Sequence, residues 1–180
     1  MTVSTHYAAP ILQFTQTDTS SILTQLPPEH HDKWQATIEL LKQQFKQLPH
    51  LAGDIILEFT NQATTTVSSV IILYRGLVFV AAIGFEQSDY QPNVLTALHE
   101  QANGLKHYHL ESRSKFIIPV SIETLASPQG GAIVVSEDLV AETMCDNGQH
   151  LAMLIEHFSN QYKDDQIILL DWLESGFEQV

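Results

Sequence analysis

The feature that most restricts the fold is a pair of long apolar runs joined by only two residues. Val67–Tyr74 reads VSSVIILY, Leu77–Ile83 reads LVFVAAI, and Arg75-Gly76 separates them. A two-residue connection that contains glycine is typical of a β-hairpin. Runs this rich in Val, Ile and Phe, with little alternation of polar residues, are typical of strands that are covered on both faces. The sequence therefore predicts a hairpin in the middle of a sheet.

Helical patterns lie on both sides of this hairpin. The first has apolar residues at steps of three and four positions, which share one helical face: Trp34, Ile38, Leu41, Phe45 and Leu48. Pro49 ends that helix, and a second helix is predicted from Pro92, a residue suited to a first helical turn, to Tyr108. A third is marked by Leu151, Leu154, Ile155 and Phe158.

Further strands are predicted at Asp54–Thr60, Lys115–Ile122, Gly130–Val135 and Gln166–Leu170. Pro119, inside the second of these, predicts a strand end or a bulge, because proline has no backbone N–H to donate to a hydrogen bond between strands. Helices and strands then alternate in a way that predicts an α/β fold, with a mixed central β-sheet flanked by helices.

Length and composition favour one domain. The 180 residues, 44% of them hydrophobic, suffice for a full core over 30–180, and 1–29 is expected to be an N-terminal arm or a short extra element. No apolar run approaches the roughly 18 residues of a membrane span, and the N-terminus does not resemble a secretory signal. Cys145 is the single cysteine, which excludes an internal disulfide and favours a cytoplasmic protein.

The net charge of −13, from 21 acidic and 8 basic residues, argues against a broad nucleic-acid groove, because phosphate contacts need Lys or Arg. A protein partner suits this charge better. Lys106, Arg113 and Lys115 form the one basic cluster. It marks either a residual nucleic-acid face or, as is commoner, a solvated helix end.

Three segments keep the order and spacing of a known nuclease family: VIILYRGLVFVAAIGF at Val70–Phe85, HEQANGLKHYHLESRSKFIIPVSIET at His99–Thr124 and DWLESGF at Asp171–Phe177. On these residues the chain resembles the PD-(D/E)xK, or restriction endonuclease-like, domain found N-terminal to Schlafen-related DNA/RNA helicases. The resemblance implies a restriction endonuclease-like core. In that family an Asp and the acid of an acid-x-Lys pair, on neighbouring strands, hold Mg²⁺ for phosphodiester cleavage, and the Lys offsets charge in the transition state.

The same resemblance implies a degenerate active site. The motif Asp, Glu and Lys fall on Ser69, Ala82 and Gly84, and the Gln and Tyr of the following helix fall on Ala97 and Gln101. Ala and Gly offer no ligand for a hard cation, and Ser is a poor substitute for a carboxylate. We therefore expect no catalytic residue, no metal and no cofactor. The expected role is that of a protein-interaction or positioning module, for a helicase or for a defence or repair complex. The expected partner is a helicase or ATPase module, or a second copy of the chain in a homo-oligomer.

Alternatives remain open on the sequence alone. An active nuclease with relocated ligands would use Glu58, Glu86 and Asp89, although edge and loop acids are common in an acidic protein. An acidic regulator that mimics nucleic acid would carry a dense negative stripe on one face. The nine histidines show no metal-binding spacing, and structural positions are the more frequent reading.

Overall fold

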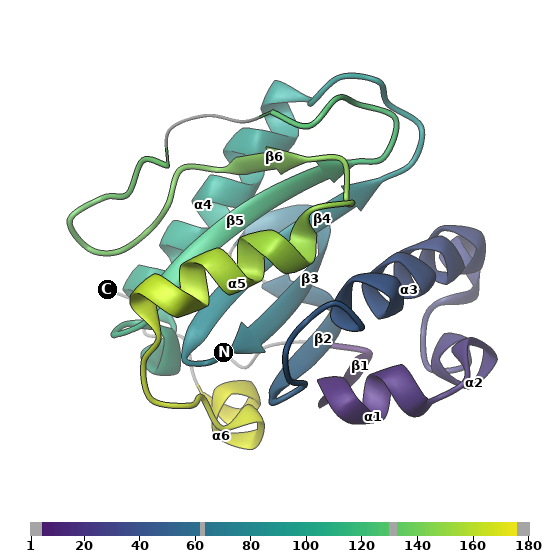
Figure 1. The fold of residues 1–180 in the computed structure, drawn as a ribbon, viewed down its shortest axis with the longest axis horizontal. Helices are drawn as coiled ribbons and strands as arrows, with labels where there is room; N and C mark the ends of the chain where they lie inside the picture. Colours follow the sequence, from purple (N-terminus) through teal and green to yellow (C-terminus); the bar gives the residue numbers. More distant parts are fainter. Residues whose placement is uncertain (1–4, 62–63, 130–132, 176–180) are drawn as a thin grey trace.

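A six-stranded mixed sheet runs through the molecule in the order β1-β2-β3-β4-β5-β6 (Figure 1). It is seen in a computed structural model that describes residues 5–61, 64–129 and 133–175. Neighbouring strands from β1 to β4 are antiparallel, whereas β5 is parallel to both β4 and β6. The strands are β1 Tyr7–Pro10, β2 Gly53–Asn61, β3 Thr64–Tyr74, β4 Leu77–Gly84, β5 Phe116–Glu123 and β6 Met144–Asp146.

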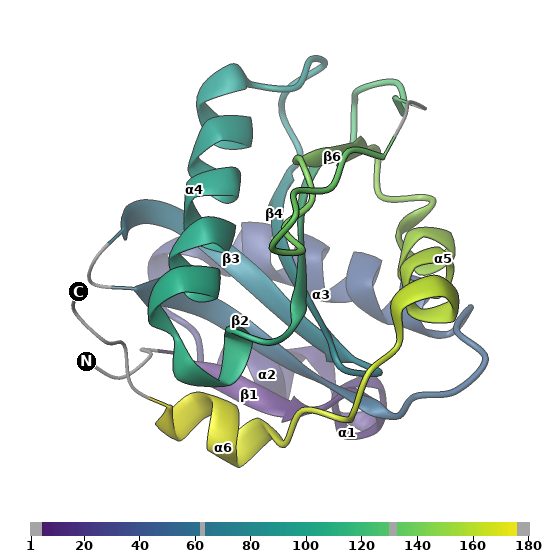
Figure 2. The same cartoon turned by 90° about the vertical axis from the view of Figure 1, so that its left-hand side faces the viewer.

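Helices cover both faces of this sheet (Figure 2). Side chains of α1, α2, α3 and α5 share one buried cluster, and side chains of α4 and α6 share the other. The helices are α1 Ile11–Gln16, α2 Thr19–Leu23, α3 His31–Phe45, α4 Pro92–Tyr108, α5 Leu151–Tyr162 and α6 Leu169–Glu174, with 3₁₀ turns η1 Pro28–His30 and η2 Leu110–Ser112. In the described part of the chain, none of them is long and apolar enough to cross a membrane. The predicted α/β architecture with a mixed, helix-flanked sheet is confirmed.

The predicted central hairpin is confirmed as β3 and β4. Arg75 and Gly76 both have positive φ, 51° and 83°, as a two-residue turn of the primed type requires. Alternate residues of the hairpin enter different clusters, so that Ile72 packs with the α3 side and Ile71 with the α4 side. Both faces are therefore buried, which explains the almost unbroken apolar sequence.

The three predicted helices are also confirmed, as α3, α4 and α5. The second has the predicted bounds, Pro92–Tyr108. The first ends at Phe45, and Leu48 is buried in the turn beyond it. Periodic apolar residues predicted these helices because each buries one face on the sheet.

The expectation that Pro119 marks a strand end or a bulge is wrong. Pro119 lies inside β5 and pairs in continuous register with Val80. Ile117 exchanges hydrogen bonds with Leu139 and Ala141 on the other side, and pairing with β6 begins only at Val120. Pro119 thus falls between two connections on that side, where a missing N–H leaves no ladder bond unmade.

Two predicted strands are not found among the residues that the structure describes. Of Gly130–Val135, residues 130–132 lie outside the described residues, and Val135 makes only an isolated bridge to Ala141. Within Gln166–Leu170 the chain is irregular as far as Ile168, and α6 then begins. The last strand is instead β6, at Met144–Asp146.

The N-terminal segment is built into the core. β1 pairs with β2 from Tyr7 to Pro10. Ile11, Phe14 and Ile22, from the two short helices that follow, have no solvent exposure and belong to the cluster that α3 contacts. Residues 7–23 therefore share one core with the domain expected over 30–180.

Candidate functional site

The carboxyl ends of the three parallel strands, β4, β5 and β6, lie together and form what we call the edge of the sheet. Gly84 at the end of β4 pairs with Glu123 at the end of β5, and Ile122 pairs with Asp146 at the end of β6. In open α/β sheets the carboxyl ends of parallel strands are the usual place for a ligand. The polar residues on this edge are therefore the first candidates for a site.

A cavity of about 700 Å³ opens at this edge. It lies between the start of α3, the loop after β4, the start of α4 and the end of β5. A smaller cavity of about 70 Å³ shares His30 and Lys33 with it. The larger cavity is lined by Pro28, Glu29, His30, His31, Asp32, Lys33, Ala36, Gly84, Phe85, Glu86, Gln87, Gln91, Val94 and Glu123.

Glu123 is the unusual member of this lining. Its side chain is buried, with 5% exposure, and its Oε2 atom has no hydrogen-bond partner among the described residues. Burial raises the pKa of the Glu123 carboxyl, and the charge of Lys33 lowers that pKa by a smaller amount. A buried acid without a partner costs folding free energy, so its presence at a cavity calls for an explanation.

Gly84 allows this carboxylate to lie where it does. A Cβ atom placed on Gly84 would be 2.3 Å from Oε2 of Glu123. The carboxylate therefore occupies the space that any side chain at position 84 would enter. Close approach of another group is the physical reason for a glycine at the end of this strand.

Asp146, the neighbouring acid on the edge, is by contrast fully engaged. Its Oδ2 accepts the backbone N–H groups of Gly148 and His150 at 2.8 and 3.1 Å, and its Oδ1 lies 3.0 Å from Nδ1 of His150. It thus stabilises the turn that leads from β6 into α5. Asp146 is a structural carboxylate, whereas Glu123 is not tied to the backbone in this way.

Tyr90 and Cys145 are two further titratable residues near Glu123 and Asp146. The Tyr90 hydroxyl donates to the carbonyl of Ser127 at 2.9 Å, and its pKa is raised by burial and then by Asp146, Cys145 and Glu123. Burial also raises the pKa of the Cys145 thiol, which disfavours the reactive thiolate.

The predicted motif positions are spread over three elements. Ser69 lies on β3, where it pairs with Phe59. Ala82 is buried in the α4-side cluster, and Ala97 and Gln101 lie on α4, with Gln101 buried. Gly84 lines the large cavity, and Ala82, Ala97 and Gln101 do not.

The alternative acids are not brought together. Glu58, at a bulge in β2 with φ 57°, lies 3.8 Å from His6. Glu86 lines the cavity, and Asp89 is exposed in the loop before α4. Within residues 5–61, 64–129 and 133–175, no group of three or more His, Cys, Asp or Glu side chains is placed to hold a metal ion.

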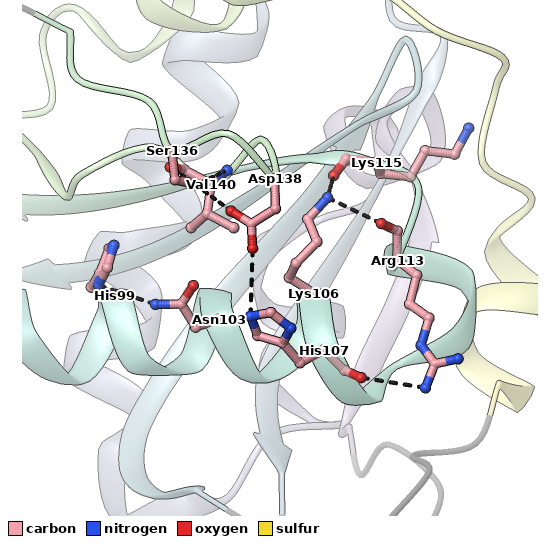
Figure 3. Close-up of polar contacts among 9 residues, drawn as sticks. All are labelled: His99, Asn103, Lys106, His107, Arg113, Lys115, Ser136, Asp138 and Val140. Carbon is pink, nitrogen blue, oxygen red and sulfur yellow. Dashed lines mark hydrogen bonds and ion pairs between the residues drawn. The ribbon is translucent and has the colours of Figure 1, made fainter. Parts of the chain in front are cut away.

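Lys106 of the basic cluster points into the protein, as Figure 3 shows, whereas Arg113 is exposed. Lys106 is buried, and its Nζ donates to the carbonyls of Arg113, at 3.2 Å, and of Lys115. Nζ of Lys115 donates to the Asp165 carbonyl at 3.1 Å and lies 3.5 Å from Asp164. Lys106 thus holds the connection between α4 and β5, and Lys115 ties the start of β5 to the segment after α5. Both are structural contacts rather than phosphate-binding ones.

His109 is a polar core residue that its sequence position did not reveal. It has no exposure; Nδ1 lies 2.8 Å from Oγ of Ser112, and Nε2 lies 3.0 Å from the carbonyl of Trp172. The Trp172 indole N–H donates to the same hydroxyl at 2.9 Å. Burial lowers the pKa of His109 to about 4, and the bond to the Trp172 carbonyl opposes that shift. The histidine is therefore neutral near pH 7 and fastens α6 to the turn after α4.

No family model matches the chain, and neither a curated protein nor a solved structure matches it. The site is thus interpreted from its own geometry. Sequence reasoning missed Glu123, although an acid directly at the end of a buried strand was the available signal. Its contact with Gly84 depends on the pairing of β4 with β5, which no local pattern encodes.

Proposed function

We propose that this chain is a restriction endonuclease-like domain that does not cleave nucleic acid and serves as an interaction or positioning module. The resemblance over Trp34–Phe177 motivates the family. The antiparallel run β2-β3-β4, followed by α4 and by β5 parallel to β4, agrees with that core.

The observation that carries the proposal is the chemistry at Ala82 and Gly84. A metal-dependent nuclease of this type needs carboxylates that hold Mg²⁺ and a cation that offsets charge in the transition state. Ala82 is buried against α4 and has no ligand atom in its side chain. The carboxylate of Glu123 fills the space beside Gly84, where the family has its lysine, so that a negative group stands where a positive one is required.

The charge of the chain supports a protein partner. The net charge of −13 opposes binding to phosphates, and the burial of Lys106 and the ion pair of Lys115 with Asp164 further reduce the free basic surface. A helicase or ATPase module, or a second copy of the chain, is the partner we propose, in a cytoplasmic setting.

The direct test is a cleavage assay on the pure 180-residue chain. Single- and double-stranded DNA and RNA are incubated with Mg²⁺ or Mn²⁺, beside a Glu58→Ala variant prepared in the same way. We expect both proteins to leave every substrate intact. Cleavage that needs the metal and disappears in Glu58→Ala would refute the proposal in favour of an active nuclease with relocated ligands.

The partner is tested separately. Sedimentation of the pure chain measures self-association, and affinity purification from native cells, followed by quantitative mass spectrometry, measures enrichment of a helicase or ATPase. A monomer that enriches neither would refute the assigned role, even if the chain cleaves nothing.

A further inference from the structure

We propose that the cavity at the carboxyl ends of β4 and β5 binds an organic cation, an ammonium or guanidinium group, which pairs with the carboxylate of Glu123. This inference is independent of the proposed function, since it concerns what the cavity holds and not whether the chain cleaves nucleic acid.

The first argument is the unpaired carboxylate. Glu123 is 95% buried, lines the cavity and leaves Oε2 without a hydrogen bond among the described residues. Asp146, at the end of the neighbouring strand β6, where it pairs with Ile122, shows that this fold can satisfy a strand-end carboxylate with backbone N–H groups. Oε2 of Glu123 has no such donor in the part of the chain that the structure describes, and a charged donor from outside would supply the partner that it lacks.

The second argument is the charge of the lining. Four acids line the cavity, Glu29, Asp32, Glu86 and Glu123, against the single basic residue Lys33 and two histidines. The first turn of α3 also faces it, and a helix N-terminus would attract an anion. Glu29 and Asp32 already bring carboxylates to that end of the helix, so the cavity keeps a net preference for positive charge.

The third argument concerns the kind of cation. The described residues contain no group of three or more His, Cys, Asp or Glu side chains placed to hold a metal ion. A volume of about 700 Å³ exceeds what a bare ion needs and is within the range of sites for small organic molecules. The adjoining cavity of about 70 Å³ has an apolar side, formed by Trp34, Val70 and Ile83, which suits the aliphatic part of such a ligand, and a polar side formed by His30, Lys33 and Thr37.

Lys33 is the natural competitor of this ligand. It is exposed at the cavity and close enough for its charge to lower the pKa of Glu123, while Oε2 remains without a hydrogen bond. Replacing Lys33 by a neutral residue therefore removes a like charge from the path of an incoming cation.

The test is titration calorimetry of the full chain with three probes. Agmatine represents a free small cation, acetyl-Gly-Arg-Gly-amide represents the side chain of a partner protein, and the same peptide with citrulline in place of arginine is the neutral isostere. The variants are Glu123→Gln, which keeps shape and removes charge, Lys33→Gln, and Glu142→Gln, an exposed acid outside the cavity that serves as the matched control.

We expect at least one of the two guanidinium probes to bind, and the citrulline peptide to bind about tenfold more weakly or not at all. Glu123→Gln should weaken binding about tenfold or more, Lys33→Gln should strengthen it, and Glu142→Gln should leave it unchanged. Tighter binding of agmatine identifies a metabolite as the source of the cation, and tighter binding of the arginine peptide identifies a protein.

Three results would overturn the inference: no binding of either guanidinium probe, equal binding of the citrulline peptide, or equal affinity in wild type and Glu123→Gln. A melting curve of Glu123→Gln shows whether a loss of binding comes from a loss of the fold. Glu123→Gln removes a buried, unpaired charge, so we expect its melting temperature to equal or exceed that of the wild type.

Discussion

His109 illustrates how one buried side chain links distant parts of the chain. It contacts Ser112, three residues later, and the carbonyl of Trp172, sixty-three residues later. Both ring nitrogens are engaged, and the ring packs against the Trp172 indole at 4.6 Å between centroids. Protonation would place a charge inside this apolar region, which is why burial holds the pKa low.

The stability of the protein should therefore depend on pH through His109. Its pKa falls from the ordinary 6.5 to about 4 on folding, so the unfolded chain binds more protons between these values. The contribution of the neutral His109 ring to the free energy of unfolding is fully present above pH 6.5. It is lost as the pH falls toward 4, and the total loss is about 3 kcal/mol.

Urea denaturation of wild type and His109→Gln from pH 7.5 to pH 4 measures this contribution. Glutamine does not titrate, so the free-energy difference between the two proteins should shrink as pH falls. Parallel stability curves over that range would show that His109 does not carry the effect.

At the scale of elements, two glycines at opposite ends of β4 meet different neighbours. Gly76, in the β3-β4 turn, has φ 83°, and a Cβ there would lie 2.7 Å from backbone atoms of Asp164 and Asp165. Gly84, at the other end, would meet the carboxylate of Glu123. Backbone cannot move aside cheaply, whereas the end of a long side chain can rotate.

We therefore expect Gly76→Ala to lower the free energy of unfolding by about 2–4 kcal/mol, because it combines left-handed strain with a backbone clash. Gly84→Ala should cost about 1 kcal/mol or less, since Glu123 can swing away. Thermal and urea unfolding of both variants give the comparison. Equal costs would mean that Glu123 is held as rigidly as backbone.

The elements that the sequence predicted well are those whose signal is local. Helices α3, α4 and α5 each bury one face whose apolar residues recur at helical spacing, and the β3-β4 hairpin shows two long apolar runs around a two-residue turn. Short apolar runs carry no such pattern. Gln166–Leu170 was predicted as a strand from its short apolar run, but helix α6 begins at Leu169, and the buried residue of this region is Trp172 on that helix.

What the sequence could not show depends on pairing across the chain. β6 has three residues, and only its contact with β5 makes Met144–Asp146 a strand. The candidate site has the same origin, because Glu123 and Gly84 meet through the register of β4 and β5. The inward direction of Lys106 likewise depends on carbonyls of the turn after α4.

At the scale of the whole molecule, the two tryptophans report on opposite sides of the sheet. Trp34 on α3 belongs to one buried cluster and Trp172 on α6 to the other. The strands β3 and β4 contribute side chains to both clusters, so loss of either layer uncovers the shared sheet. Such a structure should unfold in one step.

Single-tryptophan variants test this cooperativity. Trp34→Phe leaves Trp172 as the fluorophore, and Trp172→Phe leaves Trp34. In each variant, the fluorescence midpoint in urea should coincide with the midpoint from far-UV circular dichroism. A fluorescence transition that precedes the loss of secondary structure in one variant would reveal a layer that unfolds by itself.

The sheet ends on both sides in very short strands. β1 has four residues and finishes in Pro10, which has no N–H to offer, and β6 has three residues before the chain turns into α5. A neighbouring molecule that added a strand would find few free backbone groups along either border. Strand addition at either border is therefore disfavoured, and assemblies of the protein should be built through side chains on its helices and loops.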